Sequence, residues 1–100
     1  MAESTDPIHV THNEPVHRFE VHVDGETAVL TYRRQGDTIT FIHTGVPNGI
    51  GRHGIGSELV RTGLEYAKSQ GLKVIPLCPF AAAYVRSHPE YLDLVPEKSQ

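Results

Sequence analysis

Between residues 18 and 46, hydrophobic and polar residues alternate in three runs, a pattern typical of half-buried β-strands. The runs cover residues 18–23, 27–33 and 38 to about 46. The first places Phe19, Val21 and Val23 on one face and Arg18, Glu20 and His22 on the other, exposed face. Asp24-Gly25 and Gln35-Gly36-Asp37 separate the runs and are typical of tight turns. Because such short turns join antiparallel neighbours, the three runs predict an antiparallel meander.

After Pro47 the hydrophobic period changes from two residues to that of an α-helix. The helix is expected to end after Lys68, because Gly71 is a common residue just beyond a helix C-terminus. Residues 72–77 follow as a short, nearly continuous hydrophobic run, as expected for a buried strand in a parallel pair. The middle of the chain is therefore interpreted as a β-α-β unit. The face of its helix consists of Ile55, Leu59, Val60, Gly63, Leu64 and Ala67.

A second, shorter helix is predicted over residues 80–87. Pro79 suits the first position of this helix, which must end near His88 because Pro89 follows. We divide the chain into a polar N-terminal segment (1–14), one domain (15–95) and a C-terminal tail (96–100); the first segment is a short edge strand or a loose tail. The predicted fold is a mixed α/β domain: three antiparallel strands, a long helix, a parallel strand and a short C-terminal helix.

Composition narrows the classes of protein that this chain can represent. Its 100 residues, 38% of them hydrophobic, suffice for one compact domain with one core and one surface cleft. The formal net charge of -3 offers no basic surface, so we expect neither nucleic acid nor membrane as a partner. No hydrophobic run approaches the roughly 18 residues of a membrane span. The single cysteine and the polar N-terminus favour a cytoplasmic protein, and the oligomeric state stays open.

Candidate chemistry begins in a glycine-rich segment, residues 49–56, between the third strand and the long helix. Glycines let the backbone approach a ligand closely, and the first helical turn presents unpaired N–H groups to a phosphate or pyrophosphate. Gly49, Gly51 and Gly54 fit the dinucleotide pattern G-x-G-x-x-G, but the acidic residue that this pattern needs after the next strand is missing. A nucleotide-hydrolysing loop is disfavoured because no lysine precedes Ser57. An ordinary glycine-rich connection remains the structural alternative.

Three stretches of the sequence stand out together: His43-Thr44-Gly45-Val46, the turn Gly54-Ile55-Gly56 with Ser57-Glu58-Leu59, and Pro76-Leu77-Cys78-Pro79-Phe80. With these stretches the chain resembles the small single-domain members of the GNAT superfamily of N-acetyltransferases. The stretches occur in the expected order, and the likeness covers roughly residues 16–95. The resemblance implies a domain that binds acetyl-CoA as co-substrate and transfers its acetyl group to an amine.

The cofactor turn of this superfamily is usually written Q/R-x-x-G-x-G/A. Here Gly51 stands at the Gln/Arg position and the arginine lies one place later, at Arg52. One side-chain contact of the family pattern is therefore not expected here, while backbone amides can still cradle the phosphates. The resemblance implies that the pyrophosphate lies at residues 51–57 and the pantetheine arm between the third strand and residues 72–77. The implied cofactor-binding residues are Val46, Gly51, Arg52, His53, Gly54, Ile55, Gly56, Ser57, Cys78 and Pro79.

Cys78 is the first candidate for catalysis. It is predicted to lie at the end of the parallel strand and directly before the helix opened by Pro79, where the helix dipole favours a thiolate. The side chain could accept the acyl group and give a two-step transfer. The alternative is a buried structural cysteine that behaves as a small hydrophobic residue.

Two further candidates carry acid–base or positioning chemistry. His43 is in phase with Ile39 and Phe41, so strict alternation points it to the same face as these side chains, near the C-terminal end of its strand. A satisfied core histidine is the alternative. Tyr84 lies where the superfamily often keeps a tyrosine that protonates the coenzyme A sulfur, so the resemblance implies a general acid. Packing of an amphipathic helix is the alternative for Tyr84.

The seven histidines do not indicate a metal site. His9 and His12 are close to the expected tail, no other pair has ligand spacing on one helix, and Cys78 is alone. We expect His88 to be a solvated helix end. The resulting hypothesis is an acetyl-CoA-dependent N-acetyltransferase with an unidentified small-molecule, peptide or protein amine as acceptor. The alternative function is a non-catalytic acyl-CoA-binding or sensing module.

Overall fold

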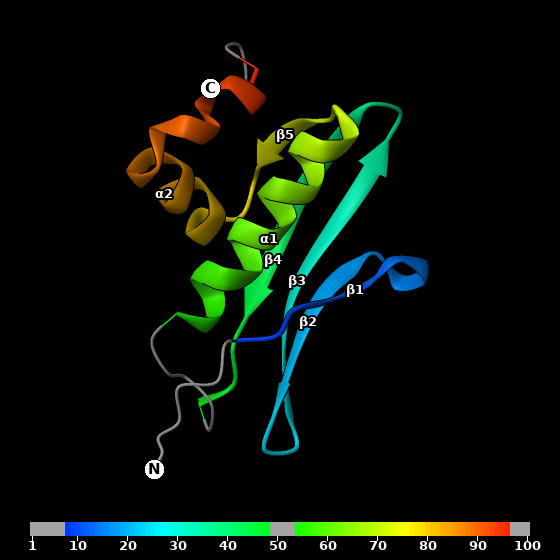
Figure 1. The fold of residues 1–100 in the computed structure, drawn as a ribbon, viewed down its shortest axis with the longest axis vertical. Helices are drawn as coiled ribbons and strands as arrows, with labels where there is room; N and C mark the ends of the chain where they lie inside the picture. The colour runs from blue at the N-terminus through cyan, green and yellow to red at the C-terminus, as the bar shows by residue number, and fades with distance from the viewer. Residues whose placement is uncertain (1–7, 49–53, 97–100) are drawn as a thin grey trace.

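The computed structural model describes residues 8–48 and 54–96, which fold around one five-stranded sheet (Figure 1). The strand order, β1-β2-β3-β4-β5, follows the chain. The first four strands pair antiparallel with their neighbours, and β5 pairs parallel with β4. The strands are β1 (Thr11–Asn13), β2 (Arg18–Val23), β3 (Glu26–Gln35), β4 (Thr38–Gly45) and β5 (Lys73–Pro76). The helices are α1 (Ile55–Gln70) and α2 (Pro79–Ser87), with 3-10 turns η1 (Glu14–Val16) and η3 (Pro89–Leu94).

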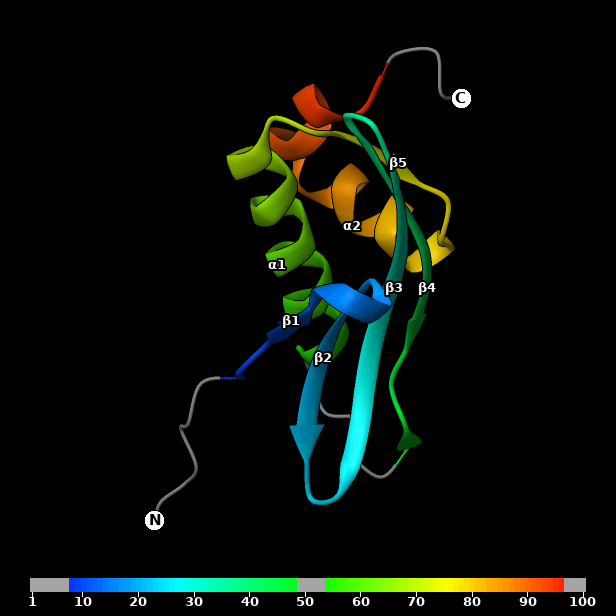
Figure 2. The ribbon, with the colours of Figure 1, turned by 90° about the vertical axis from the view of Figure 1, so that its right-hand side faces the viewer.

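Both α-helices lie on the same face of the sheet (Figures 1 and 2). Helix α1 crosses the middle of the sheet and contacts β2, β3, β4 and β5, whereas α2 packs at the β4–β5 side. None of the helices in the described ranges is long and apolar enough to cross a membrane. The predicted mixed α/β fold, with its meander, its helix order and its parallel pair, is confirmed.

The hairpin between β2 and β3 shows why the sequence signals were sufficient here. Asp24 and Gly25 both have positive φ, 52° and 80°, and Val23 pairs with Glu26 across this two-residue loop. Such a loop matches the twist of the flanking strands, and glycine adopts its backbone angles without strain. The N-terminal segment resolves in favour of an edge strand, since Thr11–Asn13 pairs with β2.

The core lies between the sheet and α1. The predicted face of α1 is buried in full, from Ile55 to Ala67. Gly63 permits the closest approach, because a Cβ atom at this position would lie 2.9 Å from the Phe41 ring and 3.0 Å from Leu30 Cδ2. A larger residue would therefore push α1 away from β3 and β4.

The end of β4 departs from strict alternation. Tyr32 of β3 pairs with Phe41, whereas Thr31 pairs with His43, so Ile42 is an extra residue in β4 and forms a β-bulge. The bulge moves His43 to the exposed face, because directly opposed residues share a face. The expectation that His43 shares the face of Ile39 and Phe41 is therefore wrong.

Glu20 of β2 is also more buried than the sequence predicted. Glu20 was expected on the exposed face, but it is only 5% exposed. Its carboxylate accepts hydrogen bonds from Arg18 Nε (2.6 Å), Asn13 Nδ2 (3.1 Å) and His22 Nε2 (3.0 Å). The bonds from Arg18 and Asn13 lower the pKa of Glu20 against the opposing effect of its burial. Neighbouring polar side chains, not the hydrophobic core, cover this carboxylate.

Candidate active site

The β4–β5 pair comes apart near its C-terminal end. Their parallel register runs from Thr38 with Lys73 to Phe41 with Pro76 and stops there. Beyond the bulge at Ile42, the described residues of β4 pair with β3. Cys78 lies at this divergence, with its backbone N–H donating to Phe41 O at 2.9 Å. The thiol is thus held at the carboxyl ends of two parallel strands, the usual location of ligands in α/β sheets.

The bulge brings Thr44 to Cys78. Thr44 pairs with Leu30, whose side chain is in the core, so Thr44 points to the helix side of the sheet. The distance between Thr44 Oγ1 and Cys78 Sγ is 3.4 Å, within the range of a hydrogen bond to sulfur. A hydroxyl beside a thiol can donate to the thiolate and stabilise it.

Cys78 has a lowered pKa although it is 5% exposed. Its burial acts to raise the pKa, but the Thr44 hydroxyl and the backbone amides of Ala81, Phe80 and Thr44 together outweigh it. Cys78 is also the N-cap of α2, where the helix dipole favours negative charge. The surroundings therefore favour the nucleophilic form of the only cysteine in the sequence.

The first backbone N–H groups of α1 have no acceptor within the helix. Gly54 is its N-cap with a left-handed φ of 97°, and no side chain caps the helix. The first backbone bond runs from Glu58 N–H to Gly54 O at 2.8 Å, which leaves the amides of Ile55, Gly56 and Ser57 without a partner inside the helix. Such an end suits a phosphate group.

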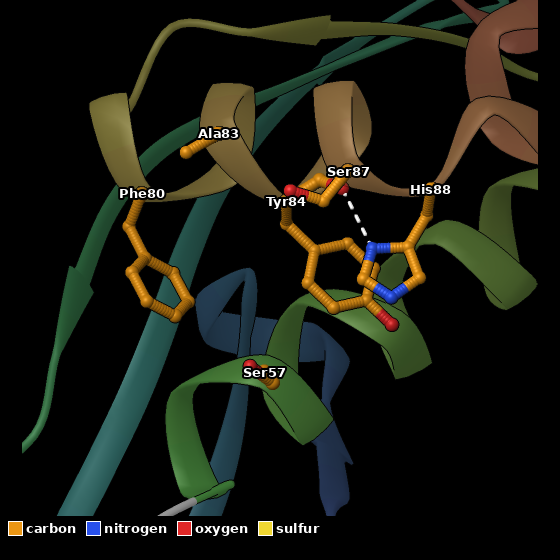
Figure 3. Close-up of a pocket in the computed structure, with 6 residues that line it drawn as sticks. All are labelled: Ser57, Phe80, Ala83, Tyr84, Ser87 and His88. Atoms are coloured by element: carbon orange, nitrogen blue, oxygen red, sulfur yellow. Dashed lines mark hydrogen bonds between the residues drawn. The ribbon is translucent and has the colours of Figure 1, made fainter.

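A groove of about 230 Å³ lies between the first turn of α1 and the side of α2 (Figure 3). In Figure 3 the rings of Phe80, Tyr84 and His88 extend from α2 toward Ser57 of α1. Phe80 also lies over Gly56, where a Cβ atom would be 2.9 Å from the ring. The groove is lined by Ser57, Phe80, Ala83, Tyr84, Ser87 and His88. It therefore begins in the first turn of α1, whose amides have no acceptor within the helix.

The structure brings some of the predicted site residues together and separates others. Cys78 lies between β5 and α2, next to Thr44, and Pro79 is the first residue of α2. Tyr84 lines the groove with Ser57, and its pKa is raised by burial. His43 is exposed and lies over Gly45, where a Cβ atom would be 2.9 Å from its Nε2.

The remaining predicted cofactor residues are in the segment that leads into α1. Val46 is half-buried against the core. Ile55 is buried in the core, so only its backbone can face a ligand. Gly51, Arg52 and His53 lie outside the described residues. Gly54 is exposed, Gly56 and Ser57 are half-buried, and their role in cofactor binding stays a prediction.

Two residues of the site were missed in the sequence. Thr44 was noted only as part of a family stretch, because the bulge that redirects it has no clear sequence signal. His88 was expected to be solvated, but it is half-buried and stacks on Tyr84 with ring centroids 3.9 Å apart. His88 is the C-cap of α2 and follows Tyr84 by four residues, a spacing that could have indicated this pair.

Comparisons with known proteins identify the family of the chain. The chain is similar to a GCN5-like protein from Staphylococcus aureus, provisionally assigned as an N-acetyltransferase, whose structure was solved by NMR. The two are 28% identical, the match covers 89% of this chain and 88% of that one, and the TM-score is 0.70. Residues 18–94 match the model of the GCN5-related N-acetyltransferase family. Because that match spans most of its length, the chain belongs to the GCN5-related N-acetyltransferase family.

Proposed function

We propose that the protein is an acetyl-CoA-dependent N-acetyltransferase and that Cys78 receives the acetyl group before the amine does. The main support for this proposal is the 3.4 Å contact between Thr44 Oγ1 and Cys78 Sγ, where β4 and β5 diverge. A family member that stabilises a thiolate at this place has a nucleophile suited to a thioester.

The chemistry of this proposal has two steps. The Cys78 thiolate attacks the thioester carbonyl, a bond forms between Sγ and the acetyl carbon, and coenzyme A leaves as a thiolate that takes up a proton. A neutral amine then attacks acetyl-Cys78, loses its extra proton and releases the Cys78 thiolate. Thr44 donates a hydrogen bond to Sγ whenever the sulfur carries negative charge, before the first step and after the second.

The start of α1 and the groove support binding of the coenzyme. The amides of Ile55, Gly56 and Ser57, which have no acceptor within α1, are suited to its pyrophosphate, which carries negative charge. The divergence of β4 and β5 has backbone groups that a pantetheine arm could pair with, next to the thiol. The acceptor class stays open to small amines, peptides and proteins.

The test uses radiolabelled acetyl-CoA and a panel of amines and peptides. We expect label to pass to an amine in the wild type, and the rate to fall at least about 100-fold in Cys78→Ala. Exposed Arg33→Gln on β3 is the control. Unchanged transfer by Cys78→Ala would show direct attack of the amine on the coenzyme. Binding of coenzyme A without any transfer would replace the proposal by a non-catalytic binding module.

A further inference from the structure

A cluster of polar side chains lies on β2 and β3, on the sheet face opposite the two α-helices (Figures 1 and 2). Val21 of β2 pairs with Ala28 of β3, and both side chains are in the core. The neighbouring pair, His22 with Thr27, points to the opposite face, because side chains alternate along a strand. Glu20 shares this face with His22. The cluster is therefore separate from the reactive site on the helix side.

Glu20, His22 and Thr27 form a chain of hydrogen bonds. His22 Nε2 lies 3.0 Å from Glu20 Oε1, and His22 Nδ1 lies 3.0 Å from Thr27 Oγ1. An ionised carboxylate only accepts hydrogen bonds, so Nε2 carries the proton of the neutral ring. Nδ1 is then an acceptor, and the Thr27 hydroxyl donates to it. A hydroxyl beside a base, with the base oriented by a carboxylate, is the arrangement of an activated nucleophile.

The Glu20 carboxylate is itself fixed from its other side. Oε2 accepts hydrogen bonds from Arg18 Nε at 2.6 Å and Asn13 Nδ2 at 3.1 Å, and Oε1 accepts from His22. The bond from Arg18 and then that from Asn13 hold the pKa of Glu20 below its ordinary value, so the carboxylate is ionised near neutral pH. Glu20 is buried, whereas the His22 side chain is 57% exposed. A buried anchor therefore orients an imidazole that a reagent in solution can reach.

The charges at this hairpin favour an uncharged reagent. Asp24 lies in the turn and Glu26 directly precedes Thr27, and all three residues are exposed. The positive charge of Arg18 is balanced by its ion pair with Glu20. The surplus negative charge disfavours donors that carry phosphates, such as an acyl-coenzyme. A small uncharged ester matches this surface better.

We propose that Thr27 is a second acyl-accepting nucleophile, activated by Glu20 and His22 toward small uncharged esters. Thr27 Oγ1 attacks the ester carbonyl while His22 Nδ1 takes its proton. A bond forms between Oγ1 and the acyl carbon, the bond from that carbon to the alcohol oxygen breaks, and the departing alcohol takes the proton from Nδ1. Water solvates the developing oxyanion on this exposed surface, so the expected acceleration is that of a general base alone, about 10²–10⁴-fold. The inference does not depend on the proposed use of acetyl-CoA.

The test treats the native protein with p-nitrophenyl acetate, an uncharged activated ester, in mildly alkaline buffer. Peptide mass spectrometry follows the acetylation of each residue with time. Thr31, on the same face of β3, is the internal reference, because its hydroxyl donates to the His43 carbonyl oxygen instead of an imidazole. We expect acetylation of Thr27 to be at least about 100-fold faster than that of Thr31. Equal rates at the two threonines would overturn the proposal.

Variants separate the chemical role of His22 from a structural one. His22→Gln keeps a polar side chain opposite Thr27 but removes the base, so the acetylation rate of Thr27 should fall at least about 100-fold. His9→Gln, also at an exposed histidine, is the matched control and should keep the rate. Glu20→Gln can donate an amide N–H to Nε2 and so favour the wrong tautomer, which should also slow the reaction. Acetylation of Thr27 that persists in His22→Gln, or that is lost in Cys78→Ala because the group comes from the thiol, would overturn the site.

Discussion

Two titratable side chains on the helix side of the sheet each contact a hydroxyl, at opposite edges of the molecule. Near β5, Cys78 Sγ lies 3.4 Å from Thr44 Oγ1; in β1, His12 Nε2 lies 2.7 Å from Tyr32 Oη. Both groups have a lowered pKa, but for different reasons. Burial raises the pKa of Cys78 and hydrogen bonds overcome it, whereas burial itself lowers the pKa of His12 against the opposing charge of Glu14.

The same direction of shift has opposite chemical meanings. A lowered thiol pKa favours the charged, reactive form, and a lowered imidazole pKa favours the neutral form, which packs. His12 stacks on Phe19 with ring centroids 4.2 Å apart and meets Tyr66 edge-on at 4.6 Å. We therefore interpret the His12 region as packing contacts that hold β1 against the core, and the Cys78 region as the reactive site.

The largest expected effect is on stability, through the packing of β1 against the core. Phe19→Ala removes a ring that is 1% exposed and supports His12, so the free energy of unfolding should fall by about 3–5 kcal/mol. Urea titration followed by circular dichroism measures this change. Below the transition, the pH dependence of Cys78 alkylation should stay as in the wild type. A loss below about 1 kcal/mol would contradict the assigned role of the ring.

The next effect is on the reactive site. Thr44→Val removes the hydroxyl from Cys78, so alkylation by iodoacetamide near neutral pH should slow roughly tenfold and its pH profile should move upward. Thr44→Ser keeps the hydroxyl and should preserve the profile. Stability in urea should change by less than about 1 kcal/mol. An unmoved profile in Thr44→Val would show that the hydroxyl does not favour the thiolate.

A smaller effect is expected from removal of the Tyr32 hydroxyl. Tyr32→Phe removes the hydroxyl that contacts His12 Nε2 while the buried ring remains. The free energy of unfolding should therefore fall by about 1 kcal/mol. The rate and pH profile of Cys78 alkylation should not change. A shifted profile in this variant would mean that the two regions are coupled, which would break the comparison.

The smallest effect is the pH dependence of the stability that His12 contributes. The folded-state pKa of His12 lies below the ordinary histidine value of 6.5, so the unfolded chain binds its proton first as the pH falls. The stability that neutral His12 contributes is complete above 6.5 and is lost as the pH falls through the lowered folded-state pKa. His12→Phe keeps a stacked ring and should give a flatter curve in urea titrations at several pH values. An identical curve in both proteins would contradict this sign.

Sequence patterns predicted most of the fold because its signals are local. The two-residue turn at Asp24-Gly25, the helical period from Ile55 to Ala67 and the stop at Gly71 each depend on nearby residues. The position of Cys78 before α2 followed from Pro79 in the same way. Where neighbours along the chain decide a structure, hydrophobic periodicity is sufficient.

The site was less predictable because it depends on contacts between distant segments. The bulge at Ile42 exchanges the faces of His43 and Thr44, and only pairing with β3 reveals it. The burial of Glu20 depends on Asn13 of β1, a strand that the sequence left open. Register and residue orientation are therefore the parts that the sequence does not specify locally.

The most direct test of the central claim is the intact mass of the native protein, quenched in acid within seconds of mixing with acetyl-CoA. Because the chain has a single cysteine, a thioester can form at one side chain only. We predict one acetyl group on Cys78, lost on treatment with hydroxylamine, absent in Cys78→Ala and formed more slowly in Thr44→Val. A native protein that binds coenzyme A and acetylates an amine, yet never carries this adduct, would contradict the account.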